Sequence, residues 1–308
     1  MIKKALGVVL CLLFCVPDVS AELIMSEFDG NIYVEKSDVK ELEELFIKNR
    51  YGRFRYLPDD EFPSIFVKSL PTDFQSIESQ KYRNELFIRI LTPLALKINE
   101  ELKNERNRLL RLEQKYLRNQ TLSPKDIELL EGMAEKYDVF VRNKNSDVRI
   151  PEQFNELKMR VNSIPPSIFV AVAAMETDWG FARVANLANS LYKEKVWYTN
   201  EGLEPLENKD DGYRFRIFKD LEESMRSFAL MFNSDKKFFS VWVSRDQSEK
   251  RIGRSVGEDI AYSLAHASNL PNYVGILDYT TAFYDLFSLD KGKLRKIDYT
   301  KQRKVNVY

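Results

Sequence analysis

The feature that most limits how this chain can fold is a continuous apolar run, IFVAVAAM, at residues 168–175. Ser163 can cap a helix ahead of the run. Pro165 and Pro166 suit a first helical turn, where a missing N–H is not needed. A helix that is apolar on all sides has to be buried. The sequence therefore predicts a central buried helix over residues 165–179, around which the rest of the chain packs.

A single carboxyl group, Glu176, directly follows the apolar run. One interpretation is that the helix reaches the surface there and the carboxylate is solvated. The other is that the carboxyl group lies at the floor of a cleft, where desolvation raises its pKa and allows it to donate a proton. Gly180 is expected to adopt the left-handed conformation that ends the helix.

Two short motifs accompany this helix: ETDWG at residues 176–180 and NSLYK at residues 189–193. They resemble the glucosaminidase family of peptidoglycan hydrolases, especially its Bax-like subgroup. That family has a proline-opened apolar helix, then Glu-Ser-x-Trp-Gly, then Asn-Asn-Leu-Phe-Gly. Thr for Ser and Tyr for Phe are mild changes. Ser190 in place of Asn and Lys193 in place of Gly are larger departures.

The resemblance implies a mostly α (α+β) fold. Its catalytic domain is lysozyme-like with a small β-hairpin lobe, and a helical N-terminal region precedes it. Residues 70–74 (LPTDF) and 91–106 also resemble the region before the catalytic domain in the Bax-like subgroup. The implied activity is that of a secreted endo-β-N-acetylglucosaminidase, with Glu176 as the general acid. Its substrate would be the β-1,4 bonds of peptidoglycan glycan strands.

The charge balance argues against two classes of partner. The chain has 308 residues, with 47 basic and 47 acidic side chains. A net charge of zero gives no overall attraction to nucleic acid or to anionic lipid. We therefore expect no nucleic-acid partner.

The N-terminal residues have the pattern of a secretory signal peptide. Lys3 and Lys4 precede an apolar core at residues 5–16, and Val-Ser-Ala at residues 19–21 is a small-residue cleavage site. The apolar core is too short to span a membrane. We expect cleavage after Ala21, no membrane span, and a periplasmic location.

Residue counts limit the chemistry of the mature chain. Cys11 and Cys15 lie inside the predicted leader, and His266 is the single histidine. A cysteine nucleophile, a disulfide and a metal site rich in cysteine or histidine are therefore not expected. There is no nucleophile elbow, and we expect no cofactor or metal. Carboxylates, tyrosines and backbone remain, which favours carbohydrate hydrolysis.

Turn signals and residue patterns suggest four segments: a signal peptide at 1–21, a helical region at 22–147, a domain at 148–290 and a basic tail at 291–308, expected to be peripheral. The resemblance implies that the domain at 148–290 is a lysozyme-like glucosaminidase domain. Residues 22–34 are expected to form a short extended or irregular lead. A long helical block covers residues 80–119, and Pro93 should kink it or start a second helix.

The small lobe is predicted from residues 201–218. KDDG at 209–212 is a turn signal and YRFRIF at 213–218 alternates in the manner of a half-buried strand. Aromatic side chains on such a lobe can stack on sugar rings. The substrate-binding candidates follow from the lobe, the second motif and the histidine: Asn189, Tyr192, Trp197, Tyr213 and His266.

The second catalytic group stays open at this stage. Asp210 and Asp211 lie on the predicted lobe and could face Glu176 across a cleft, or the acetamido group of the substrate could assist. The Bax-like subgroup has a tyrosine about six residues before its Tyr-Val pair, where this chain has Ala267. His266 is adjacent and could partly replace that tyrosine.

Two alternative functions remain. A lytic transglycosylase would use the same acid without water and leave anhydro-muramyl ends. A non-catalytic protein that binds or scaffolds the cell wall could retain the fold, and Ala267 is the feature in its favour.

Overall fold

A computed structural model of the chain describes residues 23–52, 60–142, 145–207, 211–253, 256–264 and 272–297. The predicted leader, Asp210, His266 and Ala267 lie outside these ranges.

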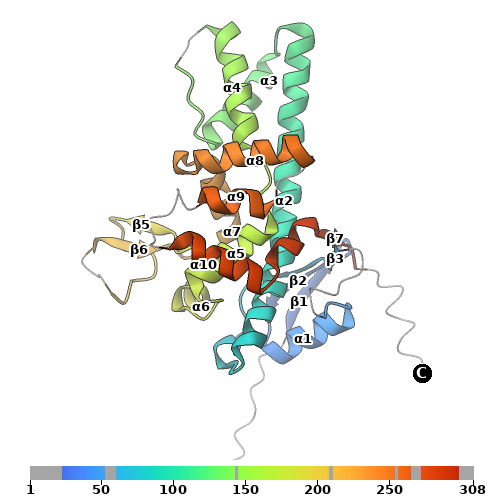
Figure 1. The fold of residues 1–308 in the computed structure, drawn as a ribbon, viewed down its shortest axis with the longest axis vertical. Helices are drawn as coiled ribbons and strands as arrows, with labels where there is room; N and C mark the ends of the chain where they lie inside the picture. Colours follow the sequence, from blue (N-terminus) through green and yellow to red (C-terminus); the bar gives the residue numbers. More distant parts are fainter. Residues whose placement is uncertain are drawn as a thin grey trace, which may run out of the picture.

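Helices dominate the described residues and the strands are short, which confirms the mostly α class (Figure 1). The helices are α1 (Val39–Lys48), α2 (Gln80–Asn119), α3 (Pro124–Lys136), α4 (Ser146–Arg160), α5 (Pro166–Thr177), α6 (Arg183–Ala188), α7 (Leu221–Ser234), α8 (Phe239–Ile252), α9 (Gly257–Leu264) and α10 (Tyr273–Phe283). The strands are β1 (Ile24–Phe28), β2 (Asn31–Lys36), β3 (Glu61–Pro63), β4 (Ile65–Val67), β5 (Lys195–Trp197), β6 (Tyr213–Phe215) and β7 (Lys293–Arg295).

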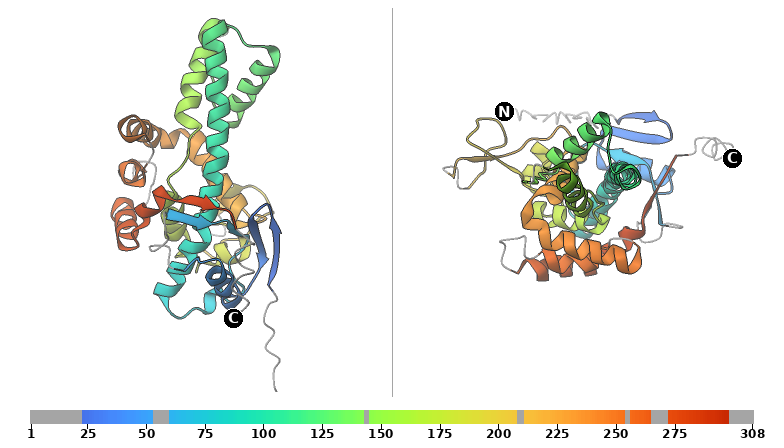
Figure 2. Two further views of the ribbon diagram at one scale, coloured as in Figure 1. Left: turned by 90° about the vertical axis from the view of Figure 1, so that its right-hand side faces the viewer. Right: turned by 90° about the horizontal axis from the view of Figure 1, so that it is seen from above.

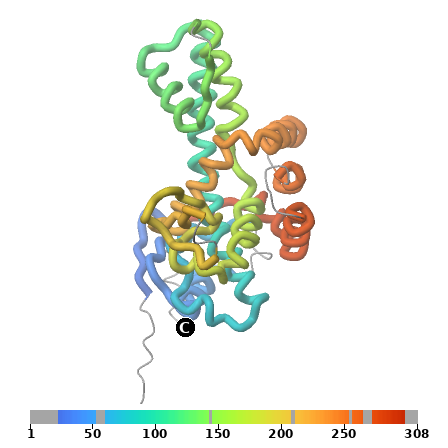
Figure 3. The backbone as a smooth tube through the Cα atoms, turned by 90° about the vertical axis from the view of Figure 1, so that its left-hand side faces the viewer, coloured from blue at the N-terminus to red at the C-terminus, as the bar shows by residue number. Residues whose placement is uncertain are grey.

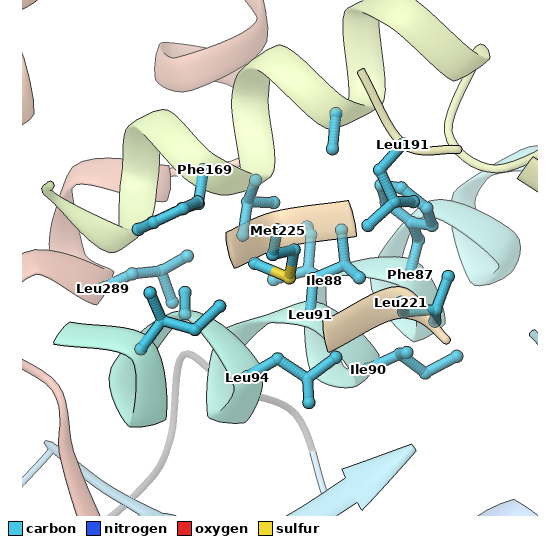
Figure 4. Close-up of a cluster of buried hydrophobic side chains, with 14 of the residues drawn as sticks. Phe87, Ile88, Ile90, Leu91, Leu94, Phe169, Leu191, Leu221, Met225 and Leu289 are labelled. Carbon is cyan, nitrogen blue, oxygen red and sulfur yellow. The ribbon is translucent and has the colours of Figure 1, made fainter. Parts of the chain in front are cut away.

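Helix α5 is the buried helix that the apolar run predicts. Every residue from Pro166 to Ala174 is buried. The helix packs against α2, α9, α10 and the short 3-10 helix Leu286–Lys291. Figure 4 shows Phe169 of α5 above the side chains of α2, with Met225 of α7 between them. The site at the end of α5 is therefore held by elements from most of the chain.

Helix α2 is the long spine of the molecule. Ser79 caps its start by accepting a hydrogen bond from the backbone N–H of Tyr82, and Gln120 ends it in the left-handed conformation. The helix continues through Pro93 and does not restart there. Thr92 donates its hydroxyl to the carbonyl oxygen of Ile88, one turn back. The first half of α2 lies in the body of the molecule and the second half extends beyond it (Figure 2).

The buried side chains of the described residues form two separate hydrophobic cores. The main core runs from Ile32 to Ile297 and includes α5, α7 and the first half of α2. The second core joins the end of α2 with α3 and α4 and includes Leu109, Met133 and Phe154. These three helices form an arm that projects from the body (Figure 1). Residues of the predicted 22–147 region contribute to both cores.

Of the extended and irregular forms predicted for the N-terminal segment, the structure shows the extended one, as paired strands. Strands β1, β2 and β4 form one sheet in that order, with β2 parallel to β4. Ile32 and Val34 point into the main core while their neighbours are partly exposed, so the alternation NIYVEK is that of a half-buried strand. Strand β7 pairs with β3, and Ile297 donates its backbone N–H to Gly30. The C-terminal stretch is therefore not peripheral as far as Ile297.

The β5–β6 lobe stands at one side of the body. Its strands are antiparallel, with Trp197 opposite Tyr213, and Leu203 forms a further bridge to Phe215. Seen from the side of the lobe, the β5–β6 segment lies in front of the body (Figure 3). The predicted hairpin lobe is therefore present, but its first strand begins before residue 201. Within the described residues, no helix combines the length and apolar character that crossing a membrane requires.

Candidate active site

The end of α5 is an unusual turn that fixes where Glu176 lies. After Thr177, three consecutive residues have positive φ: Asp178 at 48°, Trp179 at 57° and Gly180 at 79°. The left-handed turn thus begins at Asp178, two residues before the predicted Gly180. The Thr177 hydroxyl donates to the carbonyl oxygen of Ala173 at 2.6 Å and accepts from the Gly180 N–H at 2.9 Å. This side chain therefore ties the turn to the last turn of the helix.

The turn is packed tightly against α2. A Cβ atom on Gly180 would lie 2.8 Å from the Phe87 ring and 3.0 Å from the Phe74 ring. The Trp179 ring packs between Tyr284, with centroids 4.3 Å apart, and Phe87, at 6.3 Å. Since Glu176 directly precedes this turn, its position depends on that packing.

Glu176 lies in a partly enclosed position. Its side chain is 24% exposed, which is neither the fully solvated nor the fully buried extreme. Burial raises the pKa of the Glu176 carboxyl, and the positive charge of Lys193 opposes part of that increase. The Lys193 Nζ atom is 3.9 Å from Glu176 Oε2. A carboxyl group in such surroundings retains its proton at a higher pH than an ordinary glutamate.

Tyr273, the first residue of α10, is coupled electrostatically to the same carboxyl group. Burial, and secondarily the charge of Glu176, raise the pKa of Tyr273. Its hydroxyl therefore stays protonated and can donate a hydrogen bond near Glu176. In the sequence, Tyr273 and Val274 match the Tyr-Val pair of the Bax-like subgroup. That match was the available signal for a tyrosine beside the acid.

The first two residues of the second motif, Asn189 and Ser190, lie in the turn after α6 and are packed within the protein. Asn189 adopts φ 49° at the end of α6, and its amide donates to the carbonyl oxygens of Phe218 at 3.2 Å and Lys219 at 3.3 Å. Ser190 is fully buried, and its hydroxyl has no hydrogen-bond partner among the described residues. The amide of Asn189 therefore links this turn to the segment that follows β6.

Tyr192 lies against α5 and α7. Its ring stacks on Phe228, with centroids 3.9 Å apart and planes 9° apart. Its hydroxyl donates to the backbone carbonyl oxygen of Phe169 at 3.2 Å, and burial raises the pKa of Tyr192. The hydroxyl of this predicted substrate-binding residue is thus already hydrogen-bonded within the protein.

The lobe carries two exposed aromatic side chains. Trp197 is 52% exposed and Tyr198 is 93% exposed. The rings of Trp197 and Tyr213 lie 5.5 Å apart, and the Lys195 ammonium lies 3.8 Å from the Tyr213 ring centroid. Two of the predicted substrate-binding residues, the exposed Trp197 and the half-buried Tyr213, therefore form one aromatic cluster.

Among the described residues, no second carboxyl group contributes to the shift in the pKa of Glu176. Asp211 is exposed on the lobe and does not contribute to the shift in the Glu176 pKa. Glu194 accepts hydrogen bonds from Arg216 at 2.8 Å and Ser227 at 2.5 Å. Over the described ranges, no group of three or more histidine, cysteine, aspartate or glutamate side chains could hold a metal ion.

Because the pKa of Glu176 is raised, replacing this residue with one that cannot ionise should increase the free energy of unfolding, by an amount that depends on pH. The folded protein binds this proton more tightly than the unfolded chain does. The contribution of this group to the free energy of unfolding is therefore complete below its ordinary pKa of 4.5, and it is lost as the pH rises through the pKa of the folded state. Glu176→Gln, which cannot ionise, should be more stable than the wild type at about pH 7 and not at about pH 4. Urea unfolding of both proteins at the two pH values measures this, and an equal difference at both would contradict it.

Comparisons with known proteins found three matches for this chain. Residues 152–286 match the family model of mannosyl-glycoprotein endo-β-N-acetylglucosaminidase, the glucosaminidase domain. The chain is 29% identical over 182 residues to protein bax of Escherichia coli (strain K12), and the match covers 59% of this chain and 62% of that protein. The catalytic domain of the autolysin Auto from Listeria monocytogenes has a TM-score of 0.29 and 15% identity, over 55% of this chain and 99% of that one.

Residues 152–286 are therefore similar to the glucosaminidase family, and the chain is similar to protein bax. The chain spans less than two thirds of the length of the bax protein.

Proposed function

We propose that this protein is a peptidoglycan hydrolase that cleaves β-1,4 glycosidic bonds of the glycan strand as an endo-β-N-acetylglucosaminidase. The observation that carries the proposal is the Glu176 carboxyl group, half-enclosed at the end of the buried helix α5, with a pKa raised by burial. The match of residues 152–286 to the glucosaminidase family supports the choice of substrate.

Glu176 is proposed as the general acid. Cleavage of a glycosidic bond requires protonation of the leaving oxygen and stabilisation of an oxocarbenium-like centre. A carboxyl group that is still protonated near neutral pH can supply that proton. Tyr273 is proposed to orient the Glu176 carboxyl group or the bound acetamido group with its protonated hydroxyl.

The group that activates water is proposed to come from the β5–β6 lobe or from the substrate. Asp210 and Asp211 are the candidates on the lobe, and the acetamido group of the substrate is the alternative. If the lobe moves towards α5 when glycan binds, an exposed aspartate can approach the far face of the sugar.

The glycan is proposed to run from the Trp197–Tyr213 cluster towards Glu176. The flat C–H face of a pyranose ring packs against aromatic rings of this kind. Asn189 and Tyr192 are proposed to shape the wall of the site, since their polar groups are hydrogen-bonded within the protein. We propose that His266 binds substrate beside Ala267, and that residues 1–21 direct the protein to the periplasm.

Product analysis tests this function. Purified peptidoglycan is digested with the protein, reduced with borohydride, and the fragments are identified by mass spectrometry. Reduced N-acetylglucosamine ends support the proposal. Reduced N-acetylmuramic acid ends would instead identify a peptidoglycan hydrolase that cleaves the other β-1,4 bond of the strand, the one that follows N-acetylmuramic acid. Anhydro-muramyl ends identify a lytic transglycosylase. Binding without cleavage identifies a non-catalytic wall-binding protein.

A further inference from the structure

Lys193 occupies a backbone conformation that a lysine rarely adopts. Its φ is 48°, in the left-handed region, and the family motif has glycine at this position. A residue with a Cβ atom is disfavoured there by about 1–2 kcal/mol relative to its normal conformation. Such an outlier beside a candidate catalytic group is reason to look for a function of the side chain.

The side chain of Lys193 points at the proposed acid. Its ammonium nitrogen lies 3.9 Å from Glu176 Oε2, and the side chain is 41% exposed. Among the described residues, Glu176 is the carboxylate with which Lys193 forms an ion pair. The charged or titratable groups coupled to Glu176 in these residues are Lys193, before β5, and Tyr273 of α10. Lys193 therefore brings the positive charge to this site.

This ion pair favours the ionised form of Glu176 and therefore opposes general-acid catalysis. A general acid has to be neutral before it donates its proton. When Glu176 is protonated, the ammonium group of Lys193 loses its counter-ion in a partly enclosed position, which is unfavourable. A second carboxylate at Lys193 would remove that conflict.

The proposed substrate carries a carboxylate close to the oxygen atom that Glu176 would protonate. An endo-β-N-acetylglucosaminidase protonates O4 of an N-acetylmuramic acid residue, and the lactyl group is attached to the neighbouring O3. The lactyl carboxyl group is a free carboxylate where the stem peptide has been removed, and an amide where the peptide is present. The stem peptide itself has other carboxylates. An ammonium group within 4 Å of the acid at O4 is therefore within reach of this part of the glycan.

We infer that Lys193 is a specificity-determining residue that binds a carboxylate of the glycan beside the scissile bond. The lactyl carboxylate of a muramyl residue without its stem peptide is the source that the geometry favours. This inference rests on the proposed function. When the glycan carboxylate pairs with the ammonium group in place of Glu176, Glu176 takes up a hydrated proton from the bulk solvent and can act as the acid. Lys193 thus couples recognition of an anionic glycan to protonation of the acid.

The test compares glycan strands that differ in their carboxylates. The probes are strands stripped of peptides by an amidase, the same strands with lactyl carboxylates converted to methylamides, and intact strands with their peptides. The wild type should cleave the stripped strands with a kcat/KM about 10-fold higher than the methylamidated strands, the size expected of one charge-assisted hydrogen bond. A preference for intact strands over stripped strands would identify a stem-peptide carboxylate as the source.

Two variants separate the charge of Lys193 from its backbone conformation. Lys193→Met keeps the side-chain length without the charge, and Lys193→Gly restores the family residue and relieves the left-handed strain. Both should lose the preference for carboxylate-bearing strands. The alkaline limit of their pH–rate profile should move to higher pH, because the charge that lowers the pKa of Glu176 is gone. A residue with only a structural role would not move that limit.

Equal cleavage of stripped and methylamidated strands by the wild type overturns the inference, as does a preference that both variants retain. Thermal unfolding of the Lys193→Gly variant, expected at or above the wild-type Tm, shows that a lost preference does not reflect misfolding. If the wild type cleaves none of the strands, the proposed function fails, and calorimetric binding of the same strands decides the inference separately. Tighter binding of stripped than of methylamidated strands, lost in Lys193→Met, then supports it, and equal binding overturns it.

Discussion

Glu176→Gln is expected to lower the rate of glycan cleavage by about 10²–10⁴-fold, the usual contribution of a general acid. Glutamine has nearly the same shape as the protonated acid, so the surroundings of α5 should not change. Its amide cannot transfer a proton to the leaving oxygen. The loss should appear in kcat more than in KM, because the proton is needed only in the transition state. Release of soluble fragments from dye-labelled peptidoglycan and a zymogram on cell-wall material measure the effect.

Asp178→Asn is the matched control for this change. Asp178 is an exposed acid two residues further along the same turn, and asparagine also tolerates the left-handed conformation that Asp178 adopts. This variant should clear the zymogram as the wild type does. Equal clearing by the wild type and Glu176→Gln would exclude Glu176 as the acid. Absence of clearing by both would favour the non-catalytic wall-binding alternative.

The burial of α5 could be predicted because its signal is local and needs no knowledge of the partners. A run in which all faces are apolar has no favourable solvated position, whatever packs against it. The turn that follows was less predictable. Asp178 and Trp179 have a Cβ atom and would ordinarily avoid positive φ. In the fold, the Trp179 ring packs against Tyr284, which is more than 100 residues away in the sequence, so this turn has no complete local signal.

The N-terminal sheet could have been predicted in part. Asp29 and Gly30 both have positive φ, and an Asp-Gly pair between alternating segments is a strong hairpin signal. That signal was present at residues 22–34 and pointed to the β1–β2 hairpin. The pairing of β3 with β7 joins the two ends of the described chain. Such pairing depends on the complete fold and has no local signal.

The pairing of Lys193 with Glu176 also could not be read from the sequence. The motif shows only that lysine replaces glycine. Whether that side chain points to solvent or to the acid depends on the turn around Asn189 and on the stacking of Tyr192 against α7. The charge next to the acid therefore became visible only in the folded chain.

Gly180→Ala is expected to destabilise the fold by about 2–4 kcal/mol, since it combines backbone strain with a steric clash. The φ of Gly180 is 79°, which an alanine adopts only with strain. The new Cβ atom would lie 2.8 Å from the Phe87 ring, below any normal carbon–carbon contact. Phe87 is fully buried against α5 and the turn, so its ring cannot move aside without disturbing the core. Urea or guanidinium unfolding followed by circular dichroism measures the loss.

Gly132→Ala provides the control with the opposite expectation. Gly132 is exposed within α3, and a Cβ atom there meets no other atom within 4 Å. Alanine should therefore stabilise that helix by up to about 1 kcal/mol through its higher helix propensity. If Gly180→Ala unfolds at the same denaturant concentration as the wild type, the turn after α5 can relax to accept a Cβ atom. The inference that this turn holds Glu176 rigidly would then be wrong. If it is destabilised but still folded, cleavage should fall further than the folded fraction does, because a shift of Phe87 also displaces the turn that positions the acid.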